Sequence, residues 1–144
     1  MPKETVALAS DHAGVELKDI LKSELAELGF EALDLGTNSN DSVDYPDYGR
    51  AVAEAIADGR AAMGVAVCGS GIGISIAANR IKGVRAALCH NPLDARLSRQ
   101  HNDANILALG ARTTDANVAK DCLSTFLNTK FEGGRHQKRV DKLG

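Results

Sequence analysis

Apolar and polar residues alternate along the chain in two patterns, which predict strands and helices in turn. Short apolar runs have the length of buried strands, and the stretches between them carry apolar residues every three or four positions, as on one face of a helix. The runs predicted as strands cover residues 6–9, 30–35, 65–68, 84–89 and 106–109. In the first helix Leu17, Leu21 and Leu25 share the apolar face, and Lys18 and Lys22 are expected on the outer one.

This order of elements predicts the fold. Strands that alternate with helices run parallel, because each connection crosses back over the sheet, and such crossovers are right-handed. We expect a three-layer α/β/α fold, with a doubly wound, Rossmann-like sheet of five parallel strands. At 144 residues the chain has the length of one domain, which would cover residues 1–144 and include a basic C-terminal helix at about 133–143.

Composition and charge argue against several classes of function. The formal net charge is −2 with the two signs mixed, and aromatic residues make up 3% of the chain, so we expect no nucleic-acid partner. Three cysteines without paired spacing argue against both a disulfide framework and a zinc site. No apolar run reaches transmembrane length, which predicts a cytoplasmic protein without membrane contact.

The segment from Cys68 to Ile74 carries the clearest candidate chemistry. Glycine occupies positions 69, 71 and 73 between an apolar strand and a predicted helix, so a tight turn there would direct backbone N–H groups to one spot. The helix dipole would favour an anion at that spot, and the Cys68 thiolate is one such anion, usable as a base or a nucleophile. The alternative is structural: the glycines only allow close packing, and Cys68 is a small buried residue.

Other reactive residues are predicted at the same edge of the sheet. Ligands of open parallel sheets bind beyond the carboxyl ends of the strands. Those ends carry Asp11-His12, Cys68-Gly69-Ser70 and Cys89-His90. Ordinary structural interpretations stand beside the functional ones, because Asp11 could cap the following helix, Cys89 could pack at a strand end, and His90 could be solvated.

Residues in the C-terminal part of the chain are also open to two interpretations. His101 lies at a predicted helix C-terminus, where the dipole stabilises an imidazolium without any catalytic role. Arg135 and Arg139 are four residues apart, so on a helix they would share a face and could bind one phosphate, or they form a solvated basic tail. Cys122 falls on the apolar stripe of its helix, and His136 could be a solvated surface residue.

Five segments occur in an order that is typical of one enzyme family. They are Ser10-Asp11-His12-Ala13-Gly14, Asp44-Tyr45-Pro46, the stretch from Cys68 to Asn79, Ser98-Arg99-Gln100-His101-Asn102-Asp103, and the stretch from Glu132 to Val140. Together they resemble the type B ribose-5-phosphate isomerase family, whose relatives include allose-6-phosphate and galactose-6-phosphate isomerases. The resemblance implies an isomerase that interconverts an aldose phosphate and a ketose phosphate through an enediolate, with no metal or organic cofactor. It also implies a homodimer or homotetramer with the site at the subunit interface.

The resemblance further implies a role for each site residue. Cys68 would be the base that moves a proton between C2 and C1, Ser70 would pass a proton between the two oxygens, and His101 would open the furanose ring. The substrate would be bound by Asp11, His12, Tyr45, Gly69, Gly71, Ile72, Gly73, Ile74, Asn102, Arg112, Arg135 and Arg139. Among these, His12 and the three arginines would hold the phosphate, and the backbone N–H groups would hold the oxyanion.

A second branch of the family carries its base on a Glu at the position of Ile74. Residues 69–79 contain no carboxylate here, so the chain resembles the branch that uses a thiol. The leading hypothesis is interconversion of D-ribose 5-phosphate and D-ribulose 5-phosphate in the non-oxidative pentose phosphate pathway. The alternatives are an isomerase of a six-carbon sugar phosphate, allose 6-phosphate or galactose 6-phosphate, and a non-catalytic module that binds a phosphate ligand.

Overall fold

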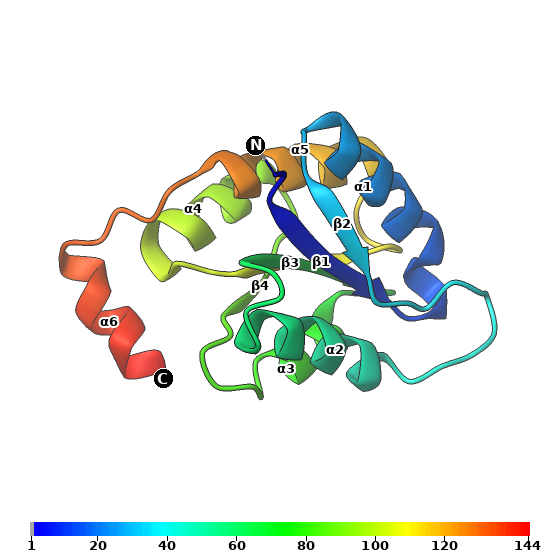
Figure 1. The fold of residues 1–144 in the computed structure, drawn as a ribbon, viewed down its shortest axis with the longest axis horizontal. Coiled ribbons are helices and arrows are strands. Elements are labelled where there is room, and N and C mark those ends of the chain that lie inside the picture. Colours follow the sequence, from blue (N-terminus) through cyan, green and yellow to red (C-terminus); the bar gives the residue numbers. More distant parts are fainter. Residues whose placement is uncertain (1) are drawn as a thin grey trace.

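The computed structural model describes residues 2–144 and shows five strands in one sheet (Figure 1). The strands are β1 (Thr5–Ser10), β2 (Glu31–Asp34), β3 (Met63–Cys68), β4 (Ala86–Leu88) and β5 (Ile106–Gly110). They lie in the order β2-β1-β3-β5-β4, and each neighbouring pair is parallel. The predicted five-stranded parallel sheet is confirmed.

Helices cover both faces of this sheet. They are α1 (Val15–Glu27), α2 (Tyr45–Ala57), α3 (Ile72–Ala78), α4 (Pro92–Asn102), α5 (Ala116–Asn128) and α6 (Arg135–Leu143), with a short 3-10 turn, η1 (His12–Gly14), before α1. Figure 1 shows α1, α4 and α5 on one side of the sheet and α2 and α3 on the other. The three-layer prediction is therefore confirmed, and α6 packs against α4 at one end of the molecule.

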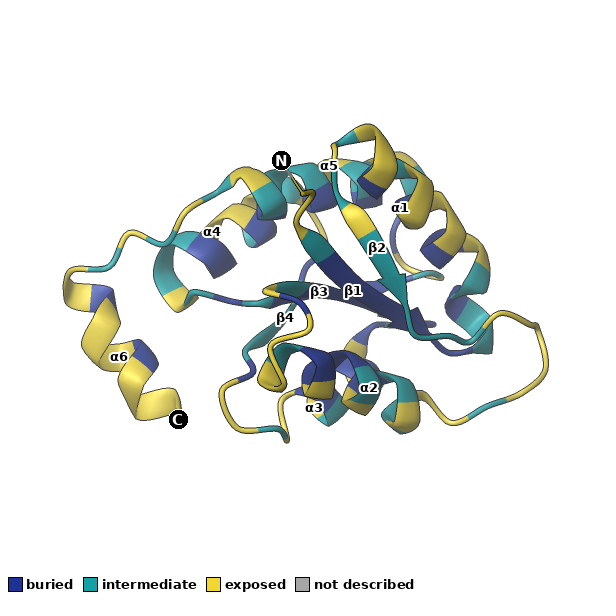
Figure 2. Cartoon of the chain, viewed as in Figure 1, coloured by how far each residue is buried: buried dark blue, intermediate teal, exposed yellow. Residues whose placement is uncertain are grey.

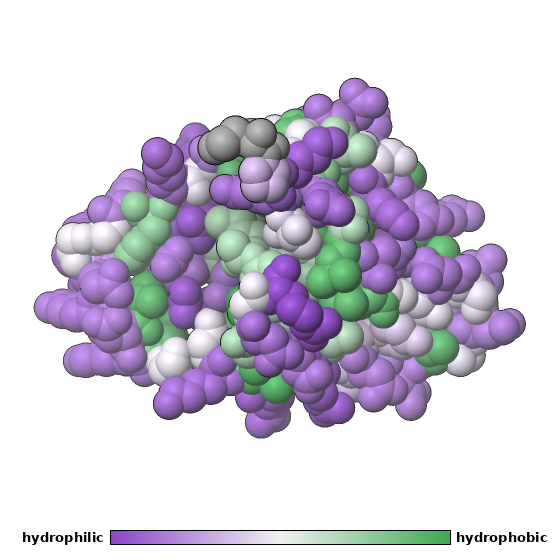
Figure 3. Space-filling model, in the orientation of Figure 1, coloured by the Kyte–Doolittle hydropathy of each residue, from purple (hydrophilic) through white to green (hydrophobic). Residues whose placement is uncertain are grey.

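Two apolar cores, one on each face of the sheet, hold the layers together. The larger core packs α1 and α5 on the sheet and contains Leu21, Leu25 and Phe126, all fully buried. The core under α2 and α3 consists mostly of small residues, and a Cβ at Gly64 would lie 2.4 Å from Val52 Cγ1. This glycine therefore lets α2 lie close to β3. Figure 2 shows the buried residues concentrated where helices and sheet meet, and the outer face in Figure 3 is mostly hydrophilic.

Lys18 departs from the position predicted for it on the outer face of α1. Its side chain is fully buried, and its Nζ donates hydrogen bonds to Asp34 Oδ1 at 2.7 Å and Asn38 Oδ1 at 2.6 Å. Helical periodicity alone predicts that Lys18 is solvent-exposed, because the pattern within one helix contains no information about the Asp34 carboxylate on β2. Burial alone would raise the pKa of Asp34, but hydrogen bonds from Lys18, the Gly36 N–H and Lys22 hold that pKa below its ordinary value.

The ends of several elements differ by one to three residues from the sequence prediction. The strand expected over 84–89 is limited to Ala86–Leu88, and α4 continues beyond residue 100 to Asn102. Asp103 ends α4 in the left-handed conformation at φ 47; its N–H donates to the Arg99 carbonyl, and the next N–H, that of Ala104, donates to the Ser98 carbonyl. His101 therefore lies in the last helical turn, as the pattern predicted.

The strand order fixes where a ligand can bind. From β1 the chain continues to β2 on one side, and β3 pairs with β1 on the other side, so the order reverses between β1 and β3. The connections after these two strands pass to opposite faces of the sheet, which leaves a crevice beyond their carboxyl ends. Asp11 and Cys68 stand at those ends, which makes this crevice the first place to look for a site.

Candidate active site

A pocket of about 560 Å³ lies beyond the carboxyl ends of β1, β3 and β5. It is lined by Asp11, Tyr45, Cys68, Gly69, Ser70, Ile72, Gly73, Ile76, Arg112 and Thr113. Eight of these ten residues belong to the predicted site. The pocket is at the switch point of the sheet, where parallel α/β folds bind their ligands.

Cys68 ends β3 and borders the pocket with only 4% of its surface exposed. The Gly71 N–H donates a hydrogen bond to Cys68 Sγ at 3.2 Å, so the sulfur is the acceptor in this contact. Gly71 makes this contact at φ 78, and a Cβ at that position would lie 2.5 Å from Leu88 Cδ1. Only glycine accommodates both the positive φ and the lack of room for a Cβ, so the contact with the thiol depends on glycine at position 71.

The first turn of α3 supplies the backbone donors that the glycine pattern predicted. The first N–H groups of a helix have no acceptor within the helix, so those of this turn that bond to no side chain are available to the pocket. Ser70 Oγ accepts one of them, the Ile72 N–H, at 3.2 Å. The Tyr45 ring lies against the same turn, since a Cβ at Gly73 would lie 2.4 Å from Tyr45 Cε1. The absence of a side chain on Gly73 therefore makes room for the aromatic ring.

Arg112 brings positive charge to the pocket from the loop after β5. Its backbone N–H donates to the Gly69 carbonyl at 2.9 Å, and a Cβ at Gly69 would lie 3.0 Å from Arg112 Nη1. Thr113, next to it, and Ile76 on α3 also line the pocket, and sequence reasoning missed both. Thr113 lies in the loop after β5, just as Asp11 lies in the loop after β1. This position after a predicted strand is the feature of the sequence that could have indicated Thr113.

Asp11 and His12 occupy the turn after β1. Asp11 accepts the Ala13 N–H at 3.0 Å, so the predicted capping role is confirmed, and the residue also lines the pocket. His12 Nδ1 accepts the Val43 N–H at 3.1 Å, which ties this turn to the loop before α2. An imidazole that accepts through Nδ1 and is neutral carries its proton on Nε2, where it can donate to a ligand.

The remaining predicted residues lie away from this pocket. His101 and Asn102 end α4, and Asn102 borders a second pocket together with Arg85 and Leu143. Arg135 and Arg139 are exposed on α6, which Figure 1 shows at one end of the molecule, next to α4. The sequence-predicted residues thus form two groups on one chain, one around Cys68 and one on α4 and α6.

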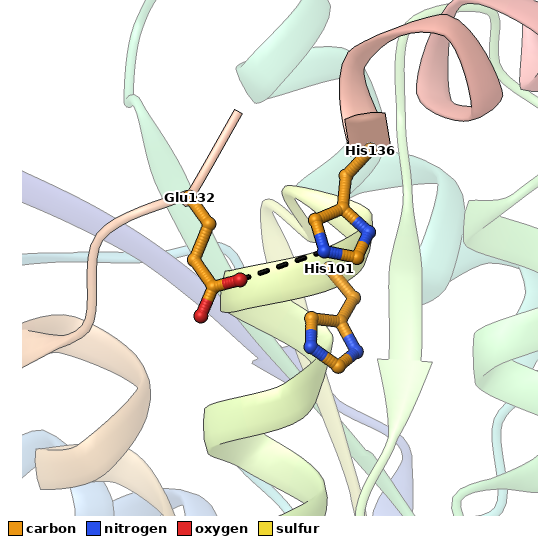
Figure 4. Close-up of side chains that lie close together, drawn as sticks. All are labelled: His101, Glu132 and His136. Atoms are coloured by element: carbon orange, nitrogen blue, oxygen red, sulfur yellow. Dashed lines mark ion pairs between the residues drawn. The ribbon is translucent and has the colours of Figure 1, made fainter. Parts of the chain in front are cut away.

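The second group is built around a pair of stacked imidazole rings. The rings of His101 and His136 lie 4.4 Å apart between centroids and 14° from parallel (Figure 4). His136 is 7% exposed, so the expectation of a surface position was wrong, and its Nε2 lies 3.5 Å from Glu132 Oε1. An isolated histidine in a basic tail gives no sign in the sequence of the ring that covers it.

The other two cysteines are structural. Cys89 is 1% exposed and Cys122 is fully buried, and neither lines the pocket. Burial raises the pKa of the Cys89 thiol to about 12 and that of Cys122 to about 11. Among residues 2–144 Cys68 is therefore the cysteine that lines the pocket, and the packing interpretation of the other two is confirmed.

Comparison with known proteins identifies the family. A family model described as Ribose/Galactose Isomerase matches residues 6–143. The chain belongs to the ribose/galactose isomerase family. Within that family it is 46% identical over 138 residues to ribose-5-phosphate isomerase B of Escherichia coli, covering 96% of this chain and 93% of that protein.

Solved structures of this isomerase family share the fold closely. Ribose-5-phosphate isomerase B of Clostridium thermocellum matches with a TM-score of 0.96 at 50% identity, covering 97% of this chain and 95% of the other. The type B enzyme of Trypanosoma brucei matches with a TM-score of 0.96 at 43% identity, covering 99% and 97%. The chain is thus an isomerase of this family. In residues 2–144 no helix has the length and apolar character needed to cross a membrane.

Proposed function

We propose that this isomerase interconverts D-ribose 5-phosphate and D-ribulose 5-phosphate through an enediolate, with Cys68 as the base. One observation carries the proposal: a nearly buried thiol borders a pocket at the switch point of the sheet, beside backbone N–H donors and an arginine. The names of the two solved relatives support this substrate. A place in the non-oxidative pentose phosphate pathway and a cytoplasmic location belong to the same proposal.

The position of the thiol supports the proposed proton transfer. The Cys68 thiolate would take the proton from C2 of the open-chain aldose, and the electron pair would move through C1 to the carbonyl oxygen, giving the enediolate. The N–H groups between Gly69 and Ile74 would stabilise the negative charge on O1 and O2, and Ser70 would pass a proton between these oxygens. Return of the proton from sulfur to C1 gives the ketose and regenerates the thiolate.

The phosphate would be held at the far end of the pocket by positive charge. Arg112 and His12 belong to the group around Cys68, and their side chains can donate to phosphate oxygens. Arg135 and Arg139 belong to the second group, with the proposed ring-opening His101 and the amide donor Asn102. Binding a dianion through several charged hydrogen bonds anchors the sugar at a distance from the reacting carbons.

The separation of the two groups supports a homodimer or homotetramer with a shared site. One chain presents an open pocket around Cys68, whereas the second group is exposed on α4 and α6. Ile72 and Ile76 at the pocket are 54% and 55% exposed, and Leu93 on α4 is 51% exposed. Exposed apolar side chains at the pocket mouth are the kind of surface that a second copy covers. The second copy would then complete each pocket with its own α4 and α6.

Proton NMR in deuterated, EDTA-containing buffer tests the proposed reaction. Wild type should convert ribose 5-phosphate to ribulose 5-phosphate with deuterium entering from solvent, and Cys68→Ala should not. Cys89→Ala is the matched control, because Cys89 also ends a strand region but does not line the pocket. A Cys68→Ala enzyme with near-normal turnover would refute the base assignment.

Substrate length is the second question for the same assay. The family description names both ribose and galactose. A six-carbon sugar phosphate is one carbon longer than ribose 5-phosphate and therefore needs a deeper pocket. The measurement is kcat/KM for ribose 5-phosphate against allose 6-phosphate and galactose 6-phosphate. A higher value for a six-carbon substrate would replace the proposed substrate, and tight binding without exchange at C2 would favour a binding module.

A further inference from the structure

The group on α4 and α6 contains a set of side chains that the proposed reaction does not explain. His101, Glu132 and His136 each offer one nitrogen or oxygen atom, and these three atoms all lie within 4.8 Å of one another (Figure 4). Among residues 2–144 this is the one group of three or more His, Cys, Asp or Glu residues found so close together. Two imidazoles and a carboxylate are a ligand set typical of Zn²⁺.

The spacing of the ligand atoms is near that of a metal site. A tetrahedral zinc ion bound at about 2.1 Å holds neighbouring ligand atoms about 3.4 Å apart. His136 Nε2 and Glu132 Oε1 are already 3.5 Å apart. The two rings are stacked, so their lone pairs run side by side, and one ring has to turn about χ2 to share an ion. That torsion has a broad intrinsic energy well, so the main cost of the rotation is the stacking contact that the ring gives up.

The backbone holds the three residues together. The Glu132 N–H donates to the Gln100 carbonyl at 3.1 Å, which fixes Glu132 beside the residue that precedes His101. Arg99 Nε donates to the Thr129 carbonyl at 3.1 Å, so the segment that leads to Glu132 is also attached to α4. These two contacts hold Glu132 beside the end of α4.

We propose that His101, Glu132 and His136 bind a divalent transition-metal ion, Zn²⁺ in particular, and that the ion inhibits the isomerase. The site uses no cysteine, so it does not conflict with the cysteine pattern of the sequence. The inhibition rests on the proposed function, because an ion bound to His101 occupies the nitrogen that would transfer a proton during ring opening. The ion is therefore an inhibitor and takes no part in the turnover.

Cobalt absorption and calorimetry test the site. Untagged, EDTA-treated wild type should bind one Co²⁺ with a visible d–d band and no sulfur-to-cobalt charge-transfer band, and one Zn²⁺ by titration calorimetry. Glu132→Gln and His136→Gln should each weaken Zn²⁺ binding by at least about tenfold, since even outer-sphere losses cost that much. His90→Gln, at an exposed histidine outside the set, is the control and should bind as wild type does.

Two results would overturn the site. They are a sulfur charge-transfer band, which would assign the ion to a cysteine, and unchanged affinity in Glu132→Gln and His136→Gln.

Inhibition is measured separately as the initial rate with ribose 5-phosphate. Zn²⁺ should abolish wild-type turnover, EDTA should restore it, and Glu132→Gln should resist inhibition. Full turnover of the zinc-loaded wild type would overturn the inhibition. A wild type that is inactive even in EDTA would instead contradict the proposed function, and the binding data would still decide the site.

Discussion

The Lys18 ammonium lies 2.7 Å from the Asp34 carboxylate and is fully buried at this contact. The pair joins α1 to the end of β2, and the third partner, Asn38, belongs to the loop that leads to Tyr45 at the pocket. A charged group in this position is tolerated only because its partners replace the water it has lost. The stability of the sheet edge and the path of the pocket loop therefore depend on the same contact.

Removing the buried ammonium should destabilise the protein strongly. Lys18→Met leaves Asp34 with the exposed Lys22 as its charged partner, and we expect the free energy of unfolding to fall by about 3 kcal/mol. Lys22→Met is the control, because that side chain is 47% exposed, and it should cost less than about 1 kcal/mol. Urea unfolding measures both. Equal losses for the two variants would mean that burial of the pair does not govern its strength.

The same pair predicts how stability varies with acid. The pKa of Asp34 is lowered from its ordinary 3.8, so its contribution to stability is present above pH 3.8 and is lost as pH falls through the folded-state pKa. The difference in unfolding free energy between wild type and Asp34→Asn should therefore be constant near neutrality and shrink below pH 3.8. A difference that stays constant in acid would show that Asp34 does not titrate with folding.

The cysteines should differ in reactivity in the native state. Burial places the pKa of Cys89 at about 12 and that of Cys122 at about 11. At about pH 8, roughly one Cys89 in ten thousand and one Cys122 in a thousand is then a thiolate. Iodoacetamide should label Cys68 first, and a bound sugar phosphate should slow that labelling. Peptide mass spectrometry follows each site, and faster labelling of Cys89 would contradict the assignment.

Gly71 should be the least replaceable glycine of the turn that follows Cys68. A methyl group there meets Leu88 Cδ1 at 2.5 Å and the Leu109 carbonyl carbon at 2.8 Å, in addition to the strain of φ 78. We expect Gly71→Ala to lower the free energy of unfolding by about 3 kcal/mol and to abolish turnover by moving the N–H that contacts Cys68.

Gly83→Ala is the matched control for this substitution. Gly83 has φ 84 with nothing within 4 Å of the added Cβ, so it carries the strain without the clash and should cost about 1 kcal/mol. Thermal unfolding and the isomerase assay provide the two measurements. A Gly71→Ala enzyme that is as stable and as active as Gly83→Ala would show that the turn adapts to a side chain.

The fold and the pocket around Cys68 could be predicted because both depend on local pattern. Alternation of strands and helices leads to a parallel sheet. The glycines after Cys68 indicate a tight turn, because glycine adopts backbone conformations that other residues avoid. Strand order places Asp11 and Cys68 at one switch point, so two residues far apart in sequence meet in one pocket. The gathering of these residues at one pocket was therefore available from the sequence.

Contacts between side chains that are far apart in the sequence could not be predicted, because no local pattern indicates them. The pattern predicts Lys18 in solvent, because its partner Asp34 belongs to another element and leaves no sign near Lys18 in the sequence. The sequence likewise allows a solvated position for His136, because it does not show that the His101 ring stacks on it. Thr113 carries no motif, and only the end of β5 brings it to the pocket.

Subunit mixing tests whether the two groups of site residues meet across an interface. Cys68→Ala removes the proposed base and Arg139→Ala removes a proposed phosphate ligand, so each homodimer alone should be nearly inactive. If each site combines Cys68 of one subunit with α6 of the other, a hybrid dimer carries one site with both substitutions and one intact site. Half of the dimers in an equal mixture are hybrids, so activity should return to about a quarter of wild type. When both residues serve the same chain's site, every site in the hybrid keeps one defect, and mixing restores nothing.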